Sequence, residues 1–329
     1  MTTEIKFVTW NVDGLGAHAR IERAKRASEE ILAENPDIIS LQEVVAVNGG
    51  NIEEIFDEAF SAGGGRYTKF CPKSYMAEYF TVTYVKKCFA TTAEVRRQSF
   101  SGAATSMMGR DMLCVILNIY GVSLMVINTH LESMKTSTLP RTMQLEEICK
   151  LMLKHPGPAI VGGDLNMRDK EQKAAFSRAT GGDEKAMIDA YDFFGKPKSA
   201  RVTWELPDQP TAKGRFDRIY HNKKGIEFIH PPIVMIGKEV IDSVGVRPSD
   251  HLGLRVSVVV NHGDPTSLSS TPSKKRTLHK PADALNAAAL REKRLKRFDS
   301  VEDATLPAGA PSPRASAAKP CAIEVVDLT

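Results

Sequence analysis

The sequence predicts a mixed α/β protein in which two β-sheets pack face to face and helices cover their outer faces, a four-layer α/β sandwich. Three observations predict it. Strand-like apolar runs are joined in some places by helical segments and in others by a short hairpin. Polar residues follow several of these runs directly. The chain has 329 residues, 42% of them hydrophobic, which is enough for one large domain with a sizeable core.

The first half of the chain begins with an alternating strand at 5–10 and a surface helix at 19–34, which Asn35-Pro36 ends. A buried strand follows at 37–43, with the carboxylate of Glu43 at its end. The remaining elements expected in this half are a short helix at 51–62, strands at 67–70, 79–85 and 94–98, and a hairpin of 113–119 and 122–128 about Tyr120-Gly121.

The second half opens with a helix at 139–155, since Pro140 suits a first turn and Pro156 lies beyond the end. A buried strand at 159–161 comes next, and Arg168 opens another helix. Residues 195–214 are expected to form a polar loop that contains Trp204. The last strands are predicted at 215–220 and 255–260.

The chain is organised around the stretch Gly162-Gly163-Asp164-Leu165-Asn166. The two glycines let the backbone approach a neighbour closely. If the strand continues, Asp164 and Asn166 point to the same face, and a carboxylate beside an amide suits a bound water and a charged oxygen. Asp and Asn after Gly are also ordinary turn residues. The interpretation of Asp164 and Asn166 as catalytic residues therefore depends on further polar clusters along the chain.

Such polar residues recur after other strand-like runs. Glu43 is either a solvated acid or a group that binds something, because an unpartnered buried carboxylate costs stability. His130 alone is typical of a structural histidine, whereas a polar turn before the final strand is the less favoured alternative for Asp250-His251. Asp217 could accept a hydrogen bond from His251, which would hold the ring and favour its charged form. All of them lie at or just beyond strand ends, so we expect them to gather at one rim.

Composition and charge exclude several classes of protein. No run approaches the roughly 18 apolar residues of a membrane span, and the N-terminus has no signal-peptide pattern, so no membrane contact is expected. The five cysteines are odd in number and lack C-x-x-C spacing, which argues against disulfides and a zinc cluster and favours a reducing compartment. Residues 1–261 hold 33 basic and 32 acidic side chains, net +1, so nucleic-acid contact there should be local.

Together the motifs form an ordered set: Trp10-Asn11, Gln42-Glu43, Asn128-Thr129-His130, Gly163-Asp164-Leu165-Asn166, Asp217 and Ser249-Asp250-His251. In this order the set resembles the endonuclease/exonuclease/phosphatase superfamily of magnesium-dependent phosphodiesterases. Several longer segments resemble the 5′-tyrosyl-DNA phosphodiesterase branch of this superfamily. They are TWNVDGL (9–15), LQEV (41–44), THLES (129–133), GGDLNMRD (162–169), VTWE (202–205), RFDRIY (215–220) and SDHLGL (249–254). The resemblance covers about residues 5 to 260.

This resemblance implies hydrolysis of the bond between a tyrosine oxygen and a DNA 5′-phosphate, at adducts that a trapped type II topoisomerase leaves behind. It implies Mg²⁺ as the cofactor, with Mn²⁺ as a substitute, and a 5′-phosphate end as the product. Two alternatives stay open. One is another metal-dependent nuclease on the same core, an abasic endonuclease or a deadenylase. The other is a non-catalytic adaptor that binds SUMO through its tail.

The resemblance also assigns roles to residues of this chain. The metal ligands are Glu43 and Asn11. The catalytic residues are Asp164, Asn166, His251, Asp217 and Asn11. Asp164 orients and deprotonates the attacking water, and Asn166 holds that water or a phosphate oxygen. Asp217 orients His251 toward the phosphoryl oxygens. The substrate-binding residues are His130, Ser133, Arg168, Trp204 and Tyr79.

Residues 262–329 differ from the catalytic domain predicted at 1–261, because Pro, Ser, Thr, Ala and charged residues dominate them and predict a disordered extension. Residues 274–297 hold 9 basic and 2 acidic side chains, net +7, which predicts a two-part nuclear import signal, a DNA-backbone contact or a solvated helix. The final residues 323–329, IEVVDLT, resemble a SUMO-interacting motif, unless they are a stray apolar terminus. We therefore expect a nuclear protein with SUMO or SUMO-modified partners.

Overall fold

The structure is a computed structural model, and it describes residues 1–46, 51–71, 79–183, 185–206 and 209–262. The first sheet contains β1 (Thr2–Asn11), β2 (Ile38–Val45), β3 (Tyr67–Phe70), β4 (Tyr79–Lys86), β13 (Ile226–Ile236) and β14 (Gly253–Asn261). The second sheet contains β5 (Glu94–Ser99), β6 (Asp111–Ile119), β7 (Val122–His130), β8 (Ala159–Asp164), β9 (Met187–Asp189) and β12 (Asp217–Asn222). A separate ribbon pairs β10 (Trp204–Leu206) with β11 (Gln209–Gly214).

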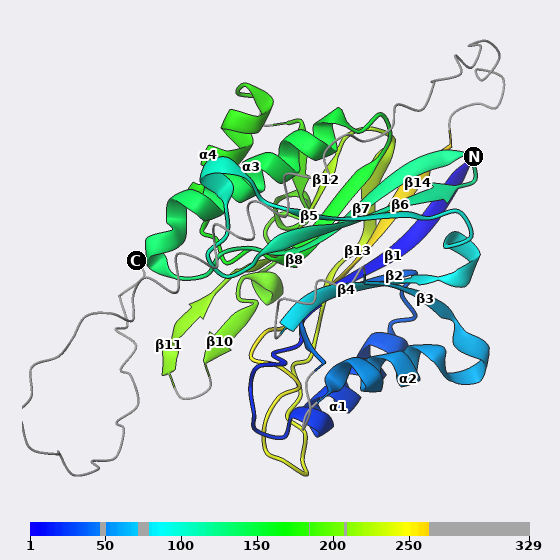
Figure 1. Cartoon of the computed structure of the whole chain (residues 1–329), viewed down its shortest axis with the longest axis vertical. Coiled ribbons are helices and arrows are strands. Elements are labelled where there is room, and N and C mark those ends of the chain that lie inside the picture. Colours follow the sequence, from blue (N-terminus) through cyan, green and yellow to red (C-terminus); the bar gives the residue numbers. More distant parts are fainter. Residues whose placement is uncertain (47–50, 72–78, 184, 207–208, 263–329) are drawn as a thin grey trace, which may run out of the picture. The chain divides into compact units, whose positions relative to one another are not determined.

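The helices are α1 (Arg20–Ala33), α2 (Ile52–Gly65), α3 (Thr138–Lys154), α4 (Asp169–Thr180) and α5 (Ala190–Phe193), with short 3-10 turns at Lys87–Phe89, Gly102–Ala104, Lys135–Ser137 and Lys198–Ala200. The strand orders are β13-β14-β1-β2-β4-β3 and β5-β6-β7-β8-β12-β9. The two sheets face each other, α1 and α2 lie outside the first sheet, and α3 and α4 lie outside the second (Figure 1). This arrangement confirms the predicted four-layer α/β sandwich.

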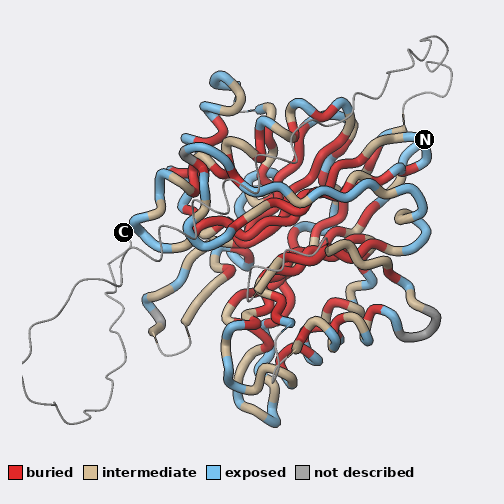
Figure 2. Tube along the Cα trace, viewed as in Figure 1, coloured by how far each residue is buried: buried red, intermediate tan, exposed pale blue. Residues whose placement is uncertain are grey.

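Three apolar layers hold these elements together, and Figure 2 shows the buried segments running along the strands. The layer between the sheets includes Phe7, Ile38, Val126, Ile160 and Val256. The layer beneath α1 and α2 includes Ile31, Phe56 and Phe60, and the layer beneath α3 and α4 includes Leu145, Ile148 and Phe176. Each sheet is therefore apolar on both faces, which leaves the strand ends as the place where polar groups gather.

Helix α3 illustrates how the sequence pattern produces an element. Pro140 lies in its first turn, where the missing N–H has no intrahelical partner to lose. Leu145, Ile148 and Met152 recur every three to four residues and are fully buried against the second sheet. Each such side chain contributes about 1.5–3 kcal/mol when it leaves water. The helix ends at Lys154, before Pro156, as predicted.

The two glycines of β8 allow the close approaches that the sequence suggested. A Cβ atom on Gly163 would lie 1.9 Å from the carbonyl oxygen of Thr129 on β7. A Cβ atom on Gly162 would lie 2.5 Å from the ring of Phe7 on the facing sheet. Both distances are far below a van der Waals contact, so a larger residue here would push β8 away from its neighbours.

The pairing register brings the polar strand ends together. The parallel pair of β7 and β8 places His130 beside Asp164, and the antiparallel pair of β8 and β12 places Asp217 opposite Asp164. In the first sheet, the parallel pair of β1 and β2 aligns Asn11 with Gln42. Because both sheets present these ends on the same side, segments more than 100 residues apart meet at one rim.

Several predictions about individual elements were wrong. Residues 204–214 were expected to be a polar loop, but Trp204 pairs with Gly214 in the ribbon of β10 and β11. Strands β9 and β13 and helix α5 were not predicted. β9 is only three residues long, and Pro231-Pro232 interrupts the pattern of β13, whose register shifts between Ile229 and Val234. Helix α2, expected at 51–62, runs on to Gly65.

The predictions for the tail lie outside the described residues, which end at 262. They concern the disordered extension at 262–329, the basic segment 274–297 and the SUMO-like segment 323–329, and the domain boundary at 261 stays a prediction with them. Cys71, Cys88, Cys114 and Cys149 are free thiols. Within the described part of the chain, no helix is both long enough and apolar enough to cross a lipid bilayer.

Candidate active site

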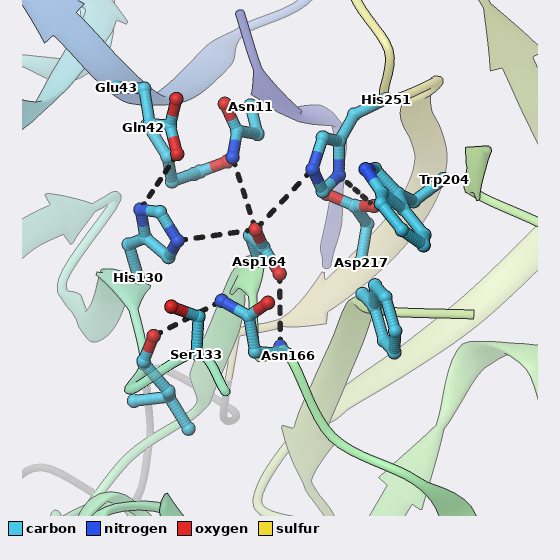
Figure 3. A network of polar contacts seen from close by, with 12 residues as sticks. Asn11, Gln42, Glu43, His130, Ser133, Asp164, Asn166, Trp204, Asp217 and His251 are labelled. Carbon is cyan, nitrogen blue, oxygen red and sulfur yellow. Dashed lines mark hydrogen bonds and ion pairs between the residues drawn. The ribbon is translucent and has the colours of Figure 1, made fainter. Parts of the chain in front are cut away.

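The predicted catalytic side chains converge on Asp164 at the rim of the two sheets (Figure 3). In the first sheet, β1 ends at Asn11, β2 contains Glu43, and the turn before β14 holds His251. In the second sheet, β7 ends at His130, β8 ends at Asp164, and β12 begins at Asp217. Their side chains point toward one another from both sheets.

Asp164 is almost fully buried and accepts contacts on both carboxylate oxygens. Asn11 donates from Nδ2 to Oδ2 at 3.0 Å, and Nε2 of His130 lies 3.2 Å from the same oxygen. Nε2 of His251 lies 3.6 Å from Oδ2, and the backbone N–H of Asn166 donates to Oδ1 at 2.9 Å. The carboxylate is thus fixed in position by groups from both sheets.

The same neighbours keep Asp164 ionised. Burial alone would raise the pKa of Asp164, but His251, followed by His130 and Asn11, outweighs burial and holds the pKa well below its usual range. An ionised carboxylate can accept a hydrogen bond from water at any physiological pH. The low pKa also means that Asp164 orients a water more effectively than it abstracts a proton from it unaided.

The backbone turns directly after Asp164, so of the two alternatives that the sequence left open, a continued strand or a turn, the structure has the turn. β8 ends at Asp164, and Asn166 adopts a left-handed conformation with φ of 52°, which Asn tolerates better than most residues. Its Nδ2 donates to the carbonyl oxygen of Leu131 at 3.2 Å. Asn166 therefore links the turn after β8 to the segment after β7, and its backbone N–H sets the orientation of Asp164.

His251 is held by a second buried carboxylate. Its Nδ1 contacts Oδ2 of Asp217 at 2.8 Å, and both side chains are more than nine-tenths buried. The hydroxyl of Thr203 accepts the backbone N–H of Asp217 at 3.0 Å. Burial lowers the pKa of His251, but Asp217 and Asp164 more than offset it and raise the pKa well above its ordinary value. The ring is therefore kept as an imidazolium.

Glu43 lies on a distorted part of β2 and faces a group of acids. Its φ is 56°, and the pairing with β4 shifts register between Leu41 and Val44, as in a β-bulge that redirects a side chain. Burial, followed by the charges of Asp250 and Glu43, raises the pKa of Asp13 to about 6, although Arg23 opposes the shift. Asp13 is therefore close enough to Asp250 and Glu43 for their charges to act on it, and we call the three residues the carboxylate cluster.

Two groups at the rim could hold a metal ion. One is the buried triad of Asp164, Asp217 and His251, whose ligand atoms all lie within 4.8 Å of one another. A site with an imidazole nitrogen suits transition metals, and two of these groups already hydrogen-bond each other. The carboxylate cluster with the amide oxygen of Asn11 offers only oxygen donors, which Mg²⁺ prefers. The donor set of the carboxylate cluster therefore fits Mg²⁺ better than the donor set of the buried triad.

An aromatic and basic pocket flanks His130. The guanidinium of Arg110 lies 5.0 Å from the ring centroid of Tyr79, and its Nη1 is 2.8 Å from Nδ1 of His130. Because Arg can only donate, Nδ1 of His130 accepts this bond and its Nε2–H faces Asp164. Tyr79, Arg110, His130 and Glu43 line the same pocket. Arg110 was missed by the sequence reasoning, since a single Arg before a strand carries no signal of its own.

Trp204 forms a second aromatic surface on the opposite side of Asp164 (Figure 3). Its ring lies 5.2 Å from Phe216 and 6.4 Å from the ring of His251. Its Nε1 donates to Oδ2 of Asp250 at 2.9 Å, which fixes the ring angle. Trp204 therefore joins the carboxylate cluster to the edge of the site, although the ribbon that carries it was predicted to be a loop.

The other two predicted substrate contacts lie on loops beside this centre. Ser133 follows β7, and its hydroxyl contacts Sδ of Met108 at 3.2 Å. Arg168 is exposed at the start of α4, two residues beyond Asn166. The sequence reasoning missed the buried pair behind these loops, Arg141 and Glu171, because charged residues on helices are usually exposed and nothing in the sequence marks these two as buried.

Comparison with known proteins places the chain in one family. A profile of the Endonuclease/Exonuclease/phosphatase family matches residues 8–251. Tyrosyl-DNA phosphodiesterase 2 of Xenopus tropicalis is 31% identical over 262 residues, which cover 77% of this chain and 65% of the relative. The protein of the same name from Homo sapiens is 30% identical over 257 residues, with 75% and 66% covered. The chain thus spans just under two thirds of the length of these relatives.

Solved structures agree with this placement. The crystal structure of D. rerio TDP2 complexed with a single-strand DNA product is 25% identical and superimposes with a TM-score of 0.65, covering 78% of this chain and 99% of that one. The crystal structure of truncated Caenorhabditis elegans TDP2 is also 25% identical, with a TM-score of 0.63 and 78% and 98% covered. The similarity extends across the two sheets that build the rim.

Proposed function

This chain belongs to the endonuclease/exonuclease/phosphatase family, and from that premise we propose that it is a metal-dependent hydrolase of 5′-phosphotyrosyl-DNA. The observation that carries the proposal is the position of Asp164, ionised and held between Asn11, His130 and His251. The similarity to tyrosyl-DNA phosphodiesterases from Xenopus tropicalis and Homo sapiens supports the choice of substrate. The finer proposal is that the adducts come from a trapped type II topoisomerase.

In the proposed reaction, a water oxygen bonds to phosphorus and the bond from phosphorus to the tyrosine oxygen breaks. Asp164 accepts a hydrogen bond from the water and orients it, and takes its proton only as the oxygen bonds to phosphorus, when that proton has become far more acidic than in free water. The Nε2–H of His251 donates to a phosphoryl oxygen, and the nearby Asp217 keeps the imidazolium charged while negative charge grows there. The products are a 5′-phosphate end and a released tyrosine or peptide.

A Mg²⁺ ion, with Mn²⁺ as a substitute, fits the oxygen donors at the rim. We propose that Glu43 and Asn11 hold it, with Asp13 and Asp250 beside them. When bound, it offsets the charge of the phosphodiester that would otherwise repel the attacking water. Burial, followed by the negative charges of Asp250 and Glu43, raises the pKa of Asp13, although Arg23 opposes the shift, so this part of the rim supplies negative charge that would attract such an ion.

The flanking residues suit a DNA end with a bulky aromatic leaving group. Trp204 presents a ring on which a terminal base of any sequence can stack. His130, Ser133 and Arg168 are proposed to contact phosphate oxygens, and Tyr79 lines the same pocket as His130. The near-neutral charge of residues 1–261 is consistent with contacts confined to this rim.

A substrate comparison tests the proposed function. The full chain would be incubated with Mg²⁺ and, in separate reactions, a 5′-phosphotyrosyl oligonucleotide, an abasic duplex and a poly(A) strand. We expect the phosphotyrosyl substrate to be cleaved fastest, and Asp164→Asn to remove that activity, which identifies this site as its source. Preference for the abasic duplex or poly(A) would favour another nuclease of the family. No cleavage of any of the three would favour a non-catalytic adaptor.

Residues beyond the described range suggest where the enzyme works. We propose that the basic segment 274–297, net +7, directs nuclear import and that the segment 323–329 binds SUMO on modified proteins. An acid-flanked β-branched run can add a strand to the edge of another sheet. A peptide of residues 318–329 is expected to shift amide resonances along one edge strand of SUMO, and an unchanged spectrum would end the SUMO proposal.

A further inference from the structure

A buried ion pair lies behind the two loops that carry Ser133 and Arg168. Nη2 of Arg141, on α3, contacts Oε1 of Glu171, in the first turn of α4, at 2.6 Å. Their side chains are only 2% and 7% exposed. A buried ion pair is poor evidence for stability, because desolvation of the two charges largely cancels their attraction. The contacts that the pair makes with the backbone suggest what else it contributes.

Arg141 fixes the loop after β7. Its Nη1 donates to the carbonyl oxygens of Glu132 at 2.9 Å and Met134 at 3.0 Å, the two residues that flank Ser133. A second side chain of α3, Gln144, accepts the backbone N–H of Glu132 at 3.0 Å. Helix α3 therefore holds the backbone on both sides of Ser133, which leaves the hydroxyl little freedom to move.

Glu171 fixes the loop after β8. Its Oε2 accepts the backbone N–H of Arg168 at 2.6 Å, while its other oxygen contacts Arg141. From the sheet side, Nη2 of Arg218 donates to the carbonyl oxygen of Met167 at 2.8 Å. The peptide group between Met167 and Arg168 is thus held on both sides, by Arg218 and by Glu171, and the Glu171 carboxylate links it to the loop that carries Ser133.

We propose that Arg141 and Glu171 are positioning residues that set the distance between the hydroxyl of Ser133 and the guanidinium of Arg168. At that distance, Ser133 and Arg168 contact the substrate's phosphates at the same time. The proposal rests on the proposed function, in which Ser133 and Arg168 contact phosphate oxygens. Arg141 and Glu171 lie behind the loops and touch no substrate. Without the pair, Ser133 and Arg168 remain present but act independently.

A double-mutant cycle measures this cooperation. Ser133→Ala, Arg168→Ala and the combined variant would be compared by kcat/KM on a 5′-phosphotyrosyl oligonucleotide, first in the natural chain and then in an Arg141→Met/Glu171→Leu background. In the natural chain we expect the two effects to be coupled by about tenfold or more. In the altered background we expect them to be independent within about twofold, with KM raised and kcat little changed.

Several outcomes would overturn the proposal. It fails if Ser133 and Arg168 already act independently in the natural chain, or if their coupling survives the loss of the pair. The matched control is Arg255→Met/Glu34→Leu, which removes an ion pair of 3.0 Å between β14 and the end of α1 and should leave the coupling intact. Urea unfolding would verify that both altered chains fold. If Arg141→Met/Glu171→Leu does not fold, Arg141→Lys serves instead, because an ammonium cannot reproduce the planar fork of Arg.

A binding measurement separates this proposal from the proposed function. The same cycle would be run on the Kd for a 5′-phosphorylated oligonucleotide, which requires no catalysis. A natural chain that fails to hydrolyse the phosphotyrosyl substrate but shows a coupling in Kd that the Arg141→Met/Glu171→Leu background abolishes would contradict the proposed reaction and support the positioning role. A chain that hydrolyses the substrate but has no coupling in either measurement would contradict the positioning role alone.

Discussion

Replacing Asp217 by Asn removes a negative charge from the surroundings of His251 and changes the shape of the site very little. Oδ2 of Asp217 lies 2.8 Å from Nδ1 of His251. At that distance and an effective dielectric constant of about 20, the attraction between the carboxylate and the imidazolium is about 6 kcal/mol before solvation is counted. The Asn amide and reorganisation of the site recover part of it. We expect at least about 2.7 kcal/mol to be lost from the transition state, a fall in kcat of about a hundredfold.

The pH dependence of kcat distinguishes this electrostatic role from a merely structural one. Asp217 and Asp164 raise the pKa of His251 well above its ordinary value, so the natural enzyme should stay active into the alkaline range. Without Asp217, His251 loses its proton at lower pH, and the alkaline fall in activity should move toward neutrality. The assay is kcat on a 5′-phosphotyrosyl oligonucleotide at saturating substrate across the neutral and alkaline range.

Asp189→Asn provides a matched control for Asp217→Asn. Asp189 is also a buried acid of the second sheet, but its Oδ2 accepts from Arg215 at 3.0 Å. We expect Asp189→Asn to leave the alkaline fall of kcat where it is in the natural enzyme. An Asp217→Asn variant with near-natural turnover, or one with an unmoved alkaline fall, would refute the reasoning about His251.

Five further changes test other parts of the account. Asp164→Asn should keep the fold by circular dichroism and lower kcat by at least about a hundredfold. EDTA should abolish activity and Mg²⁺ restore it, and Glu43→Gln should raise the Mg²⁺ concentration for half-maximal rate by about tenfold or more. Gly163→Ala should lower the urea-unfolding free energy by about 1–3 kcal/mol, because the new Cβ atom would lie 1.9 Å from the oxygen of Thr129. His221→Phe should reduce the loss of unfolding free energy between pH 7 and pH 5 by about 2 kcal/mol.

The sign of the His221 effect follows from its burial. Burial lowers the pKa of His221 to about 4 in the folded chain, below the value of about 6.5 that an unfolded chain would have. Between these values the unfolded chain binds more protons, so the natural protein loses stability as pH falls from about 6.5 to about 4. Urea titrations of both proteins at the two pH values provide the test, and equal losses of stability would contradict it.

Each of the remaining tests has its own contradictory result. Near-natural turnover of Asp164→Asn would remove Asp164 from the reaction. An unchanged Mg²⁺ requirement in Glu43→Gln would place the ion elsewhere, with the triad of Asp164, Asp217 and His251 as the other candidate. A Gly163→Ala protein as stable as the natural one would mean that β7 and β8 can separate without cost.

Long periodic elements could be predicted because their patterns are repeated many times. Helix α3 has three apolar positions at helical spacing, and the hairpin of β6 and β7 turns at Tyr120 and Gly121, which both have positive φ. Strand β9 is too short to show a period, and the prolines of β13 conceal one. The ribbon of β10 and β11 is mostly polar, so it gave the composition of a loop.

The residues at the rim could be predicted because they lie at strand ends, where pairing within each sheet brings them together. The turn at Asn166 was one of two open alternatives, because an Asn after a strand can either continue it or adopt a left-handed turn. The pair of Arg141 and Glu171 lies 30 residues apart on two helices, and only the packing of α3 against α4 makes those positions buried. Tertiary packing, which local sequence does not encode, decides such cases.

The most direct test of the central claim is hydrolysis of a 5′-phosphotyrosyl oligonucleotide in H₂¹⁸O with Mg²⁺, followed by mass spectrometry of both products. If the water held by Asp164 attacks phosphorus, one ¹⁸O atom should enter the 5′-phosphate and the released tyrosine should carry none. Label in the tyrosine oxygen, or an uncleaved substrate, would contradict the account.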